Sequence, residues 1–249
     1  MNEKMEKLLN LIKNSNRIVF FGGAGVSTES GIKDFRSVDG LYNESYDYPP
    51  EEILSHSFFM NHTSLFFKFY RDKLNTNGFS YNVTHKVLSE LEELGKLSSV
   101  ITQNIDGFHT MAGSKKVLEL HGSIKRNYCM NCGKFYDDNY VFSSKDVPIC
   151  SCGGIIKPDV VLYEEGLDYN VVEEALDEIS NADLLLVCGT SLNVYPAASF
   201  LNHYNGDNLV LINRDPTSWD SKANIVIHDS LGKIFSVIEE KIKEGYFSK

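Results

Sequence analysis

Residues 18–36 read IVFFGGAGVSTESGIKDFR, a short apolar run that enters a glycine-rich turn. A buried strand leading into such a turn is typical of the start of a nucleotide-binding α/β unit. Glycine lets the backbone approach a pyrophosphate closely, and the N–H groups of the next helix point at it. Glycine-rich turns also occur where elements merely pack closely, so the pattern alone is weak evidence for a nucleotide site. Position 28 is Thr and no acid ends a strand about twenty residues later, so the dehydrogenase fingerprint is half met.

Apolar runs and amphipathic segments alternate along much of the chain. Helical faces are expected from Met1 to Ile12 and from Val83 to Leu94, with a stop at Gly95. The other predicted elements are strands at Ile18–Phe21, Ser99–Thr102, Val117–Leu120, Asp183–Cys188, Leu209–Ile212 and Ile225–Ile227, and helices at Val171–Ile179, Ala197–Tyr204 and from Leu231. Strands separated by helices predict an α/β fold with a Rossmann-like parallel sheet covered by helices on both faces.

Two segments interrupt the alternation. Residues 37–80 contain Pro49-Pro50 and many aromatic side chains, which indicates a helical insertion with its own apolar face. Residues 125–155 carry four cysteines but few large apolar residues, so hydrophobic burial alone could hardly fold them. We therefore expect a Rossmann-like nucleotide-binding domain made of residues 1–36, 81–124 and 156–249, with a helical insertion at 37–80 and a cysteine module at 125–155.

Charge and hydropathy exclude several classes of protein. Lys and Arg number 24 and Asp and Glu number 34, which leaves a formal net charge of −10. This balance argues against a broad surface for nucleic acid or for an anionic membrane. No apolar run approaches the roughly 18 residues of a membrane span, and the first residues do not resemble a secretory signal. We expect a cytoplasmic monomer that binds neither nucleic acid nor membrane.

Four of the five cysteines lie in one short segment. Cys129-x-x-Cys132 is followed, after 17 residues, by Cys150-x-Cys152. In a reducing compartment this clustering favours a metal over disulfides, and two close thiolate pairs fit a structural zinc site with no open position. An iron–sulfur cluster is the alternative metal, although its usual spacings differ. The second pair has only one residue between its cysteines, and this tighter turn makes a degenerate site without metal the other alternative. Cys188, in an apolar strand, is expected to be a core residue.

Polar residues follow several predicted strands, at the edge where open α/β sheets bind ligands. Thr102–His109 reads TQNIDGFH, which could hold an amide-bearing ring, although by spacing alone an Asx-rich turn is the stronger interpretation. His121 stands before Gly122 at a strand end and is a candidate general base, with His109 as its competitor. The triplets Gly189-Thr190-Ser191 and Asn213-Arg214-Asp215 could contact a dinucleotide or form ordinary turns.

Together these motifs resemble the sirtuin family of NAD-dependent protein deacylases, in its bacterial type. Residues 23–36 match the family pattern GAGxSxxSGIxDFR from Gly23 onward, and TQNIDGFH is similar to TQNIDxLH with Phe108 in place of Leu. The histidine of the family's LHG stretch corresponds to His121, and the triplets at 189 and 213 correspond to its GTS and N-x-(D/E) positions. The resemblance covers nearly the whole chain and implies NAD as co-substrate and one structural zinc ion.

The resemblance also implies roles for individual residues. His121 and Asn104 are catalytic, Asn104 by holding the ribose and its water. The implied NAD-binding residues are Ala24, Gly25, Thr28, Asp34, Phe35, Arg36, Gln103, Asn104, Ile105, Asp106, His121, Gly189, Thr190, Ser191, Asn213 and Arg214. The implied peptide-binding residues are Val160, Leu162, Tyr163 and Val194, and the zinc ligands are Cys129, Cys132, Cys150 and Cys152. An acyl-lysine peptide would add as a strand between residues 158–165 and 193–196.

The implied reaction is deacylation of lysine. The acyl oxygen attacks the nicotinamide ribose carbon, which expels nicotinamide and leaves an alkylimidate. His121 then deprotonates a ribose hydroxyl that attacks the imidate carbon, and water completes the transfer of the acyl group to ADP-ribose, which frees the lysine amine. The alternatives are ADP-ribosyl transfer or NAD hydrolysis on the same scaffold, and a non-catalytic binder of NAD or ADP-ribose. Phe67 and Tyr70 stand where some members carry a Tyr and an Arg, so an apolar acyl pocket is expected, lined by Phe35, Val160 and aromatic residues of the insertion. Tyr163-Glu164-Glu165 replaces the Phe-Gly-Glu of many members.

Overall fold

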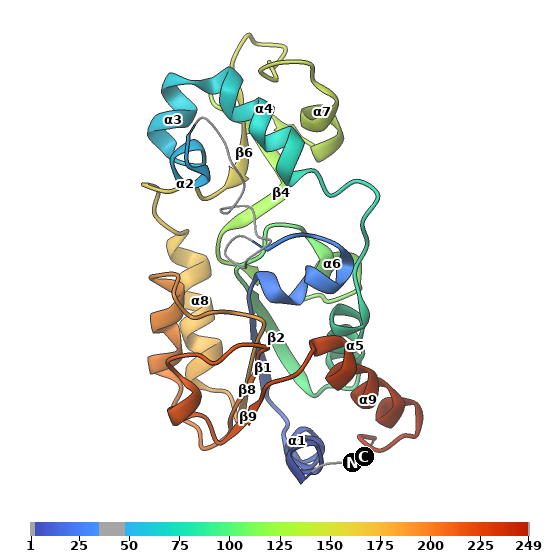
Figure 1. The fold of residues 1–249 in the computed structure, drawn as a ribbon. Coiled ribbons are helices and arrows are strands. Elements are labelled where there is room, and N and C mark those ends of the chain that lie inside the picture. The colour runs from blue at the N-terminus through green and yellow to red at the C-terminus, as the bar shows by residue number, and fades with distance from the viewer. Residues whose placement is uncertain (1–2, 35–47, 249) are drawn as a thin grey trace.

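The computed structural model describes residues 3–34 and 48–248, so Phe35 and Arg36 lie outside the described residues. The chain forms a larger part around a six-stranded sheet and a smaller part around a three-stranded sheet, stacked in Figure 1. No helix among the described residues is long and apolar enough to span a membrane.

The larger sheet is entirely parallel and has the strand order β3-β2-β1-β7-β8-β9. Its strands are β1 (Ile18–Gly22), β2 (Leu97–Thr102), β3 (Val117–Glu119), β7 (Leu184–Cys188), β8 (Leu209–Ile212) and β9 (Ile225–Ile227). The chain builds outward from β1 on one side and then returns to place β7 on the other side. The order therefore reverses between β1 and β7, and this switch point is where doubly wound sheets bind ligands.

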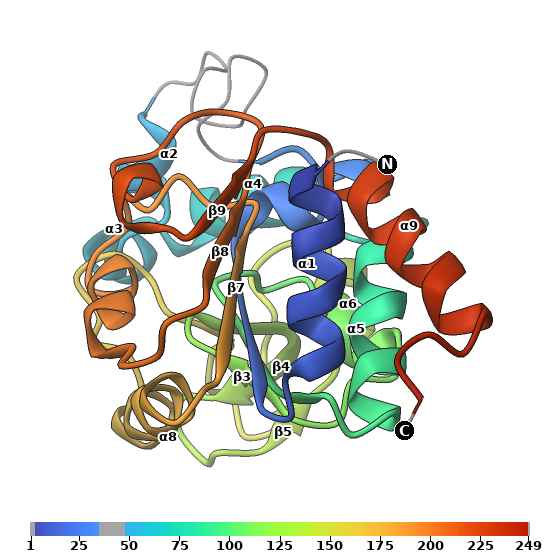
Figure 2. The ribbon, with the colours of Figure 1, turned by 90° about the horizontal axis from the view of Figure 1, so that it is seen from below.

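Helices cover both faces of this sheet, as Figure 2 shows from below. The helices on one face are α1 (Glu3–Asn14), α5 (Val83–Glu93) and α9 (Leu231–Lys243), and the other face carries α8 (Tyr169–Ser180) and the 3₁₀ helix η4 (Ala197–His203). Side chains of β1 alternate between the faces: Phe20 packs into the first core and Phe21 into the second. Both are fully buried, so the strand reads as a continuous apolar run.

Most predicted elements are confirmed, with three differences. Leu94, expected on the buried face of its helix, is 39% exposed because α5 ends at Glu93 and Leu94 caps it. The segment Ala197–His203 is a 3₁₀ helix, not an α-helix. The glycine turn is followed by two single 3₁₀ turns, η1 (Ala24–Val26) and η2 (Thr28–Ser30), and not by the long helix of a simple dinucleotide fingerprint.

The smaller part joins the two interrupting segments. Its sheet has the order β5-β4-β6 and is antiparallel, with β4 (Gly122–Cys129), β5 (Phe135–Tyr136) and β6 (Ile156–Val160). Its helices are α2 (Pro50–Ile53), α3 (His56–Asn61), α4 (Thr63–Leu74) and α7 (Asp138–Ser143). The insertion aromatics share one core with Cys129, Cys150 and Ile156. The insertion therefore supplies the apolar surface that the cysteine module lacks, while the predicted domain boundaries stay a prediction.

Two short helices complete the described chain. Helix α6 (Phe108–Met111) directly follows the TQNID segment, and the 3₁₀ helix η5 (Asp220–Lys222) precedes β9. Both lie in the larger part.

Candidate active site

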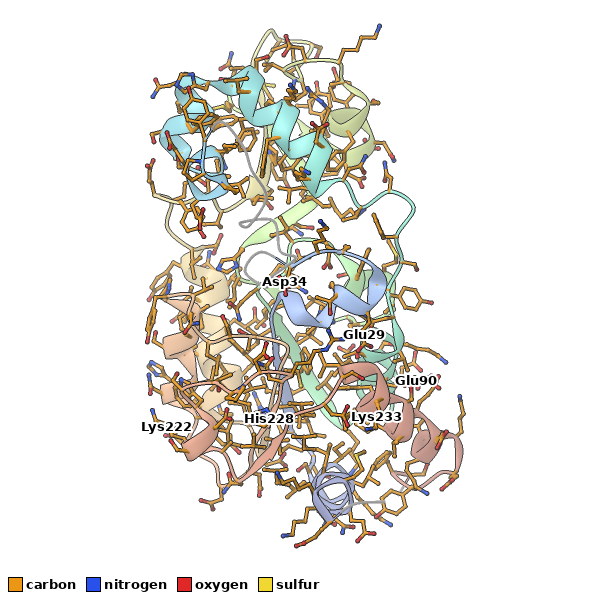
Figure 3. All side chains as sticks on the ribbon, viewed as in Figure 1. Glu29, Asp34, Glu90, Lys222, His228 and Lys233 are labelled. Atoms are coloured by element: carbon orange, nitrogen blue, oxygen red, sulfur yellow. The ribbon has the colours of Figure 1, made fainter. Side chains whose placement is uncertain are left out.

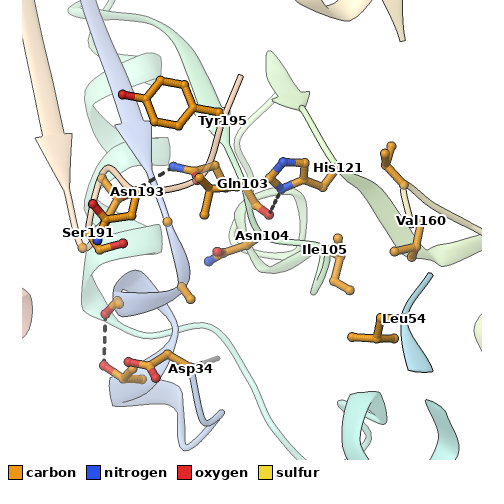
Figure 4. Close-up of a pocket in the computed structure, with 18 of the residues that line it drawn as sticks. Asp34, Leu54, Gln103, Asn104, Ile105, His121, Val160, Ser191, Asn193 and Tyr195 are labelled. Carbon is orange, nitrogen blue, oxygen red and sulfur yellow. Dashed lines mark hydrogen bonds between the residues drawn. The ribbon is translucent and has the colours of Figure 1, made fainter. Parts of the chain in front are cut away.

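A cavity of about 770 Å³ lies at the carboxyl ends of β1, β2, β7 and β8 and extends toward the smaller part. The predicted residues that line it are Ala24, Gly25, Thr28, Asp34, Gln103, Asn104, Ile105, His121, Val160, Leu162, Tyr163, Gly189, Thr190, Ser191, Val194, Asn213 and Arg214. Figure 4 shows several of them facing a common space from opposite sides. Residues separated by almost 200 positions are thus brought together at the switch point of the sheet.

The glycine turn forms part of the cavity floor, where its backbone lies in close contact with the loop that follows β7. The N–H of Gly25 donates to the carbonyl oxygen of Gly189 at 2.8 Å. A Cβ atom on Gly25 would lie 2.8 Å from the Cα of Gly189, and Gly189 itself has a φ of +58°. Side chains would push these two loops apart, so glycine is required at both positions by the approach of the two backbones.

Gln103 connects the end of β2 to the loop after β7. Its backbone N–H donates to the Gly22 carbonyl at 2.9 Å, and its side-chain Nε2 donates to Thr190 Oγ1 at 3.1 Å. These bonds hold three strand ends in register around the cavity. The side chain is consequently a structural part of the wall between the glycine turn and the Gly189 loop.

A chain of hydrogen bonds runs from the cavity wall to a buried carboxylate. Asn104 Nδ2 donates to Ser27 Oγ at 3.1 Å, and Ser27 Oγ donates to Asp106 Oδ2 at 2.6 Å. Asp106 also accepts from the N–H of Phe108 at 2.8 Å. Because Asn104 donates through Nδ2 to Ser27, the orientation of its amide is set. Among the described residues, Asp106 supports the wall from behind and does not line the cavity.

Burial governs the titration of Asp106. The residue is 6% exposed, and desolvation raises the pKa of its carboxyl above the ordinary value, against the lowering effect of the Ser27 hydrogen bond. Ser27 was not among the predicted site residues. The only available signal was its place within the glycine motif, since its link to Asp106 joins positions 79 apart in the chain.

His121 lies between the larger and smaller parts, where the chain passes from β3 to β4. Its Nδ1 lies 2.9 Å from the backbone carbonyl oxygen of Gln103, as the dashed line in Figure 4 shows. A carbonyl only accepts, so Nδ1 carries the proton and Nε2 is the basic nitrogen. The next residue, Gly122, has a φ of +72°, and a Cβ there would lie 1.9 Å from the Asp159 carbonyl oxygen. Glycine therefore permits the close approach of residue 122 to the backbone of β6, and this approach positions His121.

His109, the competing candidate, does not line the cavity of the described chain. It is 2% exposed and packs with its ring centroid 4.6 Å from that of His85. Burial, together with neighbouring His85, places its pKa well below the ordinary value. His109 therefore stays neutral in the core and is poorly placed to exchange protons with a ligand.

The end of the cavity nearest the smaller part is apolar. Its wall includes Leu54, Leu74, Ile105 and Val160, and Figure 4 shows Leu54, Ile105 and Val160 grouped beside His121. The expectation that insertion aromatics form this wall is wrong for the described residues. Phe67 and Tyr70 are fully buried in the shared core, because α4 turns its aromatic face toward the cysteine module. The missed residues Leu54 and Leu74 come from the ends of α2 and α4.

Residues that follow β8 and β9 surround the other end of the cavity. Asn213, Arg214 and Asp215 are joined there by Asp229 and Leu231, which sequence reasoning missed. Arg214 lies 3.6 Å from Glu29, and Figure 3 shows Glu29 and Asp34 on the segment after the glycine turn. The position of Asp229 just after a predicted strand was the signal that could have identified it.

The four clustered cysteines converge on one point. All four Sγ atoms lie within 4.8 Å of one another, with 3.4 Å between Cys129 and Cys152 and 3.6 Å between Cys132 and Cys150. Tetrahedral zinc with Zn–S bonds of about 2.3 Å places sulfur atoms about 3.8 Å apart. The shortened Cys150-x-Cys152 pair therefore still brings both sulfurs into reach, and the donor set fits a structural zinc ion.

Cys188 is separate from this cluster. It is fully buried in β7, and desolvation raises the pKa of its thiol well above the ordinary value. The prediction that it serves as a core residue is confirmed.

Comparison with known proteins agrees with this geometry. Residues 23–196 match the family described as the Sir2 family. A NAD-dependent protein deacetylase of Clostridium perfringens is 57% identical over 242 residues, covering 96% of this chain and 99% of the relative. A solved structure of Sir2 with a p53 peptide and NAD+ is 35% identical with a TM-score of 0.83 and full coverage of both chains. A Sir2 variant with a deacetylated p53 peptide and 3'-O-acetyl-ADP-ribose is 34% identical with a TM-score of 0.86, covering 97% and 98%. This chain belongs to the Sir2 family.

Proposed function

We propose that the chain is an NAD-dependent protein deacetylase that transfers the acyl group of an acyl-lysine to ADP-ribose and releases nicotinamide. One observation carries the proposal. His121, with its basic Nε2 set by the bond from Nδ1 to Gln103, lines a cavity that extends from the glycine turn and Asn213 to the apolar wall at Leu54 and Val160. A deacetylase needs a base at the point where cofactor and acyl group meet, and a simple binder does not.

NAD would occupy the polar end of the cavity. Ala24, Gly25 and Thr28 line this end and would contact the pyrophosphate, while Ser191 and Asn213, which also line it, would contact the adenosine half. Phe35 and Arg36, which lie outside the described residues, stay predicted NAD contacts by resemblance.

The nicotinamide ribose would lie near Asn104 and His121. Asn104 lines the cavity and its Nδ2 is bound by Ser27, so its Oδ1 would be the acceptor for a ribose hydroxyl or an ordered water. His121 would take the proton from a ribose hydroxyl when that hydroxyl attacks the acyl carbon. Ile105 and the buried Asp106 would shape the nicotinamide end, Asp106 through its neighbours.

The acyl-lysine would enter between the two segments that flank the apolar end. Val160, Leu162 and Tyr163 lie on one side and Val194 on the other, which suits a peptide added as a strand. The acyl chain would lie against Leu54, Leu74 and Ile105. The side chains of these three residues are hydrocarbon and offer no positive charge to a carboxylate, so acetyl and longer apolar chains are favoured over succinyl.

Zinc would be held by Cys129, Cys132, Cys150 and Cys152 and would stabilise the smaller part. Four protein thiolates leave no open coordination position, so this metal supplies structure and no chemistry. The predictions of a cytoplasmic monomer without a nucleic-acid partner stay predictions.

The decisive experiment incubates the protein with acetylated, myristoylated and succinylated peptides, with and without NAD, and identifies the products by mass spectrometry. We expect deacylated peptide, nicotinamide and O-acyl-ADP-ribose, formed only with NAD. ADP-ribose attached to protein, or free ADP-ribose without peptide deacylation, would instead establish ADP-ribosyl transfer or NAD hydrolysis. Binding of NAD without any product would make the chain a non-catalytic binder.

A further inference from the structure

We propose that Glu164 is a positioning residue: its side chain ties the peptide-binding segment 160–165 to helix α3 and so sets the affinity for the acyl-lysine peptide. The inference rests on the proposed function, because that function assigns the segment to the peptide. It concerns a residue whose two carboxylate oxygens accept hydrogen bonds from Ser57.

The backbone of Glu164 adopts a conformation that its residue type disfavours. Its φ is +76°, in the left-handed region where glycine is at ease and a side chain is not. In the part of the chain that the structure describes, Leu192 is the other non-glycine residue with positive φ. Leu192 is 3% exposed and is held by packing in the core. Glu164 lines the open cavity, so its conformation needs a different anchor.

The anchor is a two-point hydrogen bond from Ser57. The backbone N–H of Ser57 donates to Oε2 of Glu164 at 2.8 Å, and its Oγ donates to Oε1 at 2.9 Å. Both carboxylate oxygens are thus used by one residue 107 positions earlier in the chain. Hydrogen bonds to a charged acceptor are about twice as strong as neutral ones, which offsets the backbone cost.

Neighbouring contacts extend this tie into a ladder. The N–H of Tyr163 donates to the Leu54 carbonyl and the N–H of His56 donates to the Tyr163 carbonyl, each at 3.0 Å. Glu165 lies 2.8 Å from His56 Nδ1, and its other oxygen accepts from the N–H of Leu162 at 2.9 Å. The segment 162–165 is therefore fastened to residues 54–57 by backbone and side chains together.

The ladder fixes two functional walls at once. Leu54 belongs to the apolar wall of the acyl pocket, and Leu162 and Tyr163 belong to the edge that would receive the peptide. A segment already held in place loses little further conformational freedom when the peptide binds. Loosening it should weaken peptide binding while leaving NAD binding and the chemical step intact.

The variant Glu164→Gly tests this, because glycine keeps positive φ accessible and removes the whole side chain, including the carboxylate that accepts from Ser57. We expect the KM for acetylated peptide, and its Kd measured by fluorescence anisotropy, to rise about 5- to 20-fold, the scale of losing hydrogen bonds to a charged group. The kcat and the KM for NAD should stay within about twofold. Amide hydrogen exchange of residues 55–59 and 162–167 in the free protein should become faster.

Two further variants separate the tie from loss of charge or of stability. Ser57→Ala removes one of the two donors and should give a smaller rise, with no added effect in the Glu164→Gly background. Glu173→Ala removes a negative charge from an exposed position on α8 and should leave peptide affinity unchanged.

The outcomes distinguish this inference from the proposed function. If the peptide KM and Kd of Glu164→Gly are unchanged, or if only its kcat falls, the inference about Glu164 is overturned. The proposed function would still stand in that case, provided that the wild type is active. A wild type that binds peptide but never deacylates it would refute the function, and weakened binding in Glu164→Gly would still support the inference. A wild type that binds no acetylated peptide would overturn both.

Discussion

The Nδ1 atom of His121 lies 2.9 Å from the backbone carbonyl oxygen of Gln103. Because Gln103 directly follows β2, the tautomer and the direction of the base are set at the same sheet edge that lines the cavity. A backbone acceptor cannot be exchanged by mutation, which makes this orientation a property of the fold itself. The function of His121 can therefore be tested by removing its ring without disturbing what orients it.

His121→Ala should leave NAD affinity within about threefold and lower the deacetylation kcat by two or more orders of magnitude, the usual scale for a general base. Isothermal titration with NAD and product analysis with acetylated peptide measure the two quantities. His203→Ala, an exposed histidine on η4, is the matched control and should retain full turnover. Near-normal turnover in His121→Ala would remove this residue from the role of base.

Ser27→Ala should reduce kcat/KM for acetylated peptide about tenfold. The hydroxyl is the link between Asn104 and the buried Asp106, and its loss frees the Asn104 amide to rotate and leaves a buried carboxylate short of a donor. Steady-state kinetics of Ser27→Ala, Asn104→Ala and the double variant measure the coupling. If Ser27 acts through Asn104, the double variant is no worse than Asn104→Ala. Additive losses would show that the two act separately.

Much of the fold follows from local patterns. Continuous apolar runs such as Leu184–Cys188 predict buried parallel strands because both faces of each strand are covered, and their ends locate the carboxyl edge where the site lies. The close spacing within each cysteine pair likewise predicts that the four thiols form one metal site. These predictions succeed because each depends on residues close in sequence or on the one rule that parallel strands share an edge.

What local patterns miss depends on packing between distant segments. Phe67 and Tyr70 look like pocket residues in sequence, yet the cysteine module needs their apolar surface and buries them. Leu54 reaches the pocket because residues 54–56 pair with Tyr163, and nothing near Leu54 encodes that pairing. The same holds for the link between Ser27 and Asp106. Such contacts form when segments far apart in the sequence pack together, and the pattern within each segment does not predict which other segment it will contact.

Leu54→Phe should shorten the apolar pocket and discriminate between acyl chains. Leu54 is 8% exposed and belongs to the pocket wall, so a larger ring there fills space that a long chain would occupy. We expect kcat/KM to fall at least tenfold for myristoylated peptide and less than threefold for acetylated peptide, since about two methylene groups of lost burial cost about 1.6 kcal/mol. Equal losses for both peptides would place the acyl chain elsewhere.

Acid should destabilise the protein through its buried histidines. Burial lowers the pKa of His85 to about 4 and also places that of His109 well below its ordinary value. As the pH falls below about 6.5, the unfolded chain binds these protons and the folded chain does not. The free energy of unfolding should then fall by about 1.4 kcal/mol per pH unit for each histidine. Urea unfolding between pH 7.5 and 5 measures this slope.

The control for this effect replaces one ring at a time. His109→Phe keeps an aromatic group beside Phe20 and His85 but cannot titrate, so its unfolding free energy should depend less steeply on pH. His203→Ala, at an exposed position, should leave the slope as in the wild type. A pH slope that His109→Phe does not change would assign acid sensitivity to other groups.

Removal of zinc should unfold the smaller part before the larger one. Cys129 and Cys150 share a core with the insertion aromatics, so loss of the metal leaves thiolates within 4.8 Å of one another and loosens the packing of α3 and α4. Metal analysis should give one zinc per chain, and a chelator should lower the Tm and abolish deacetylation while NAD still binds the larger sheet. Cys150→Ser should lose the metal, whereas Cys188→Ala should retain one zinc despite a less stable core. A metal-free native protein with full activity would mean that the four thiols hold the smaller part together without an ion.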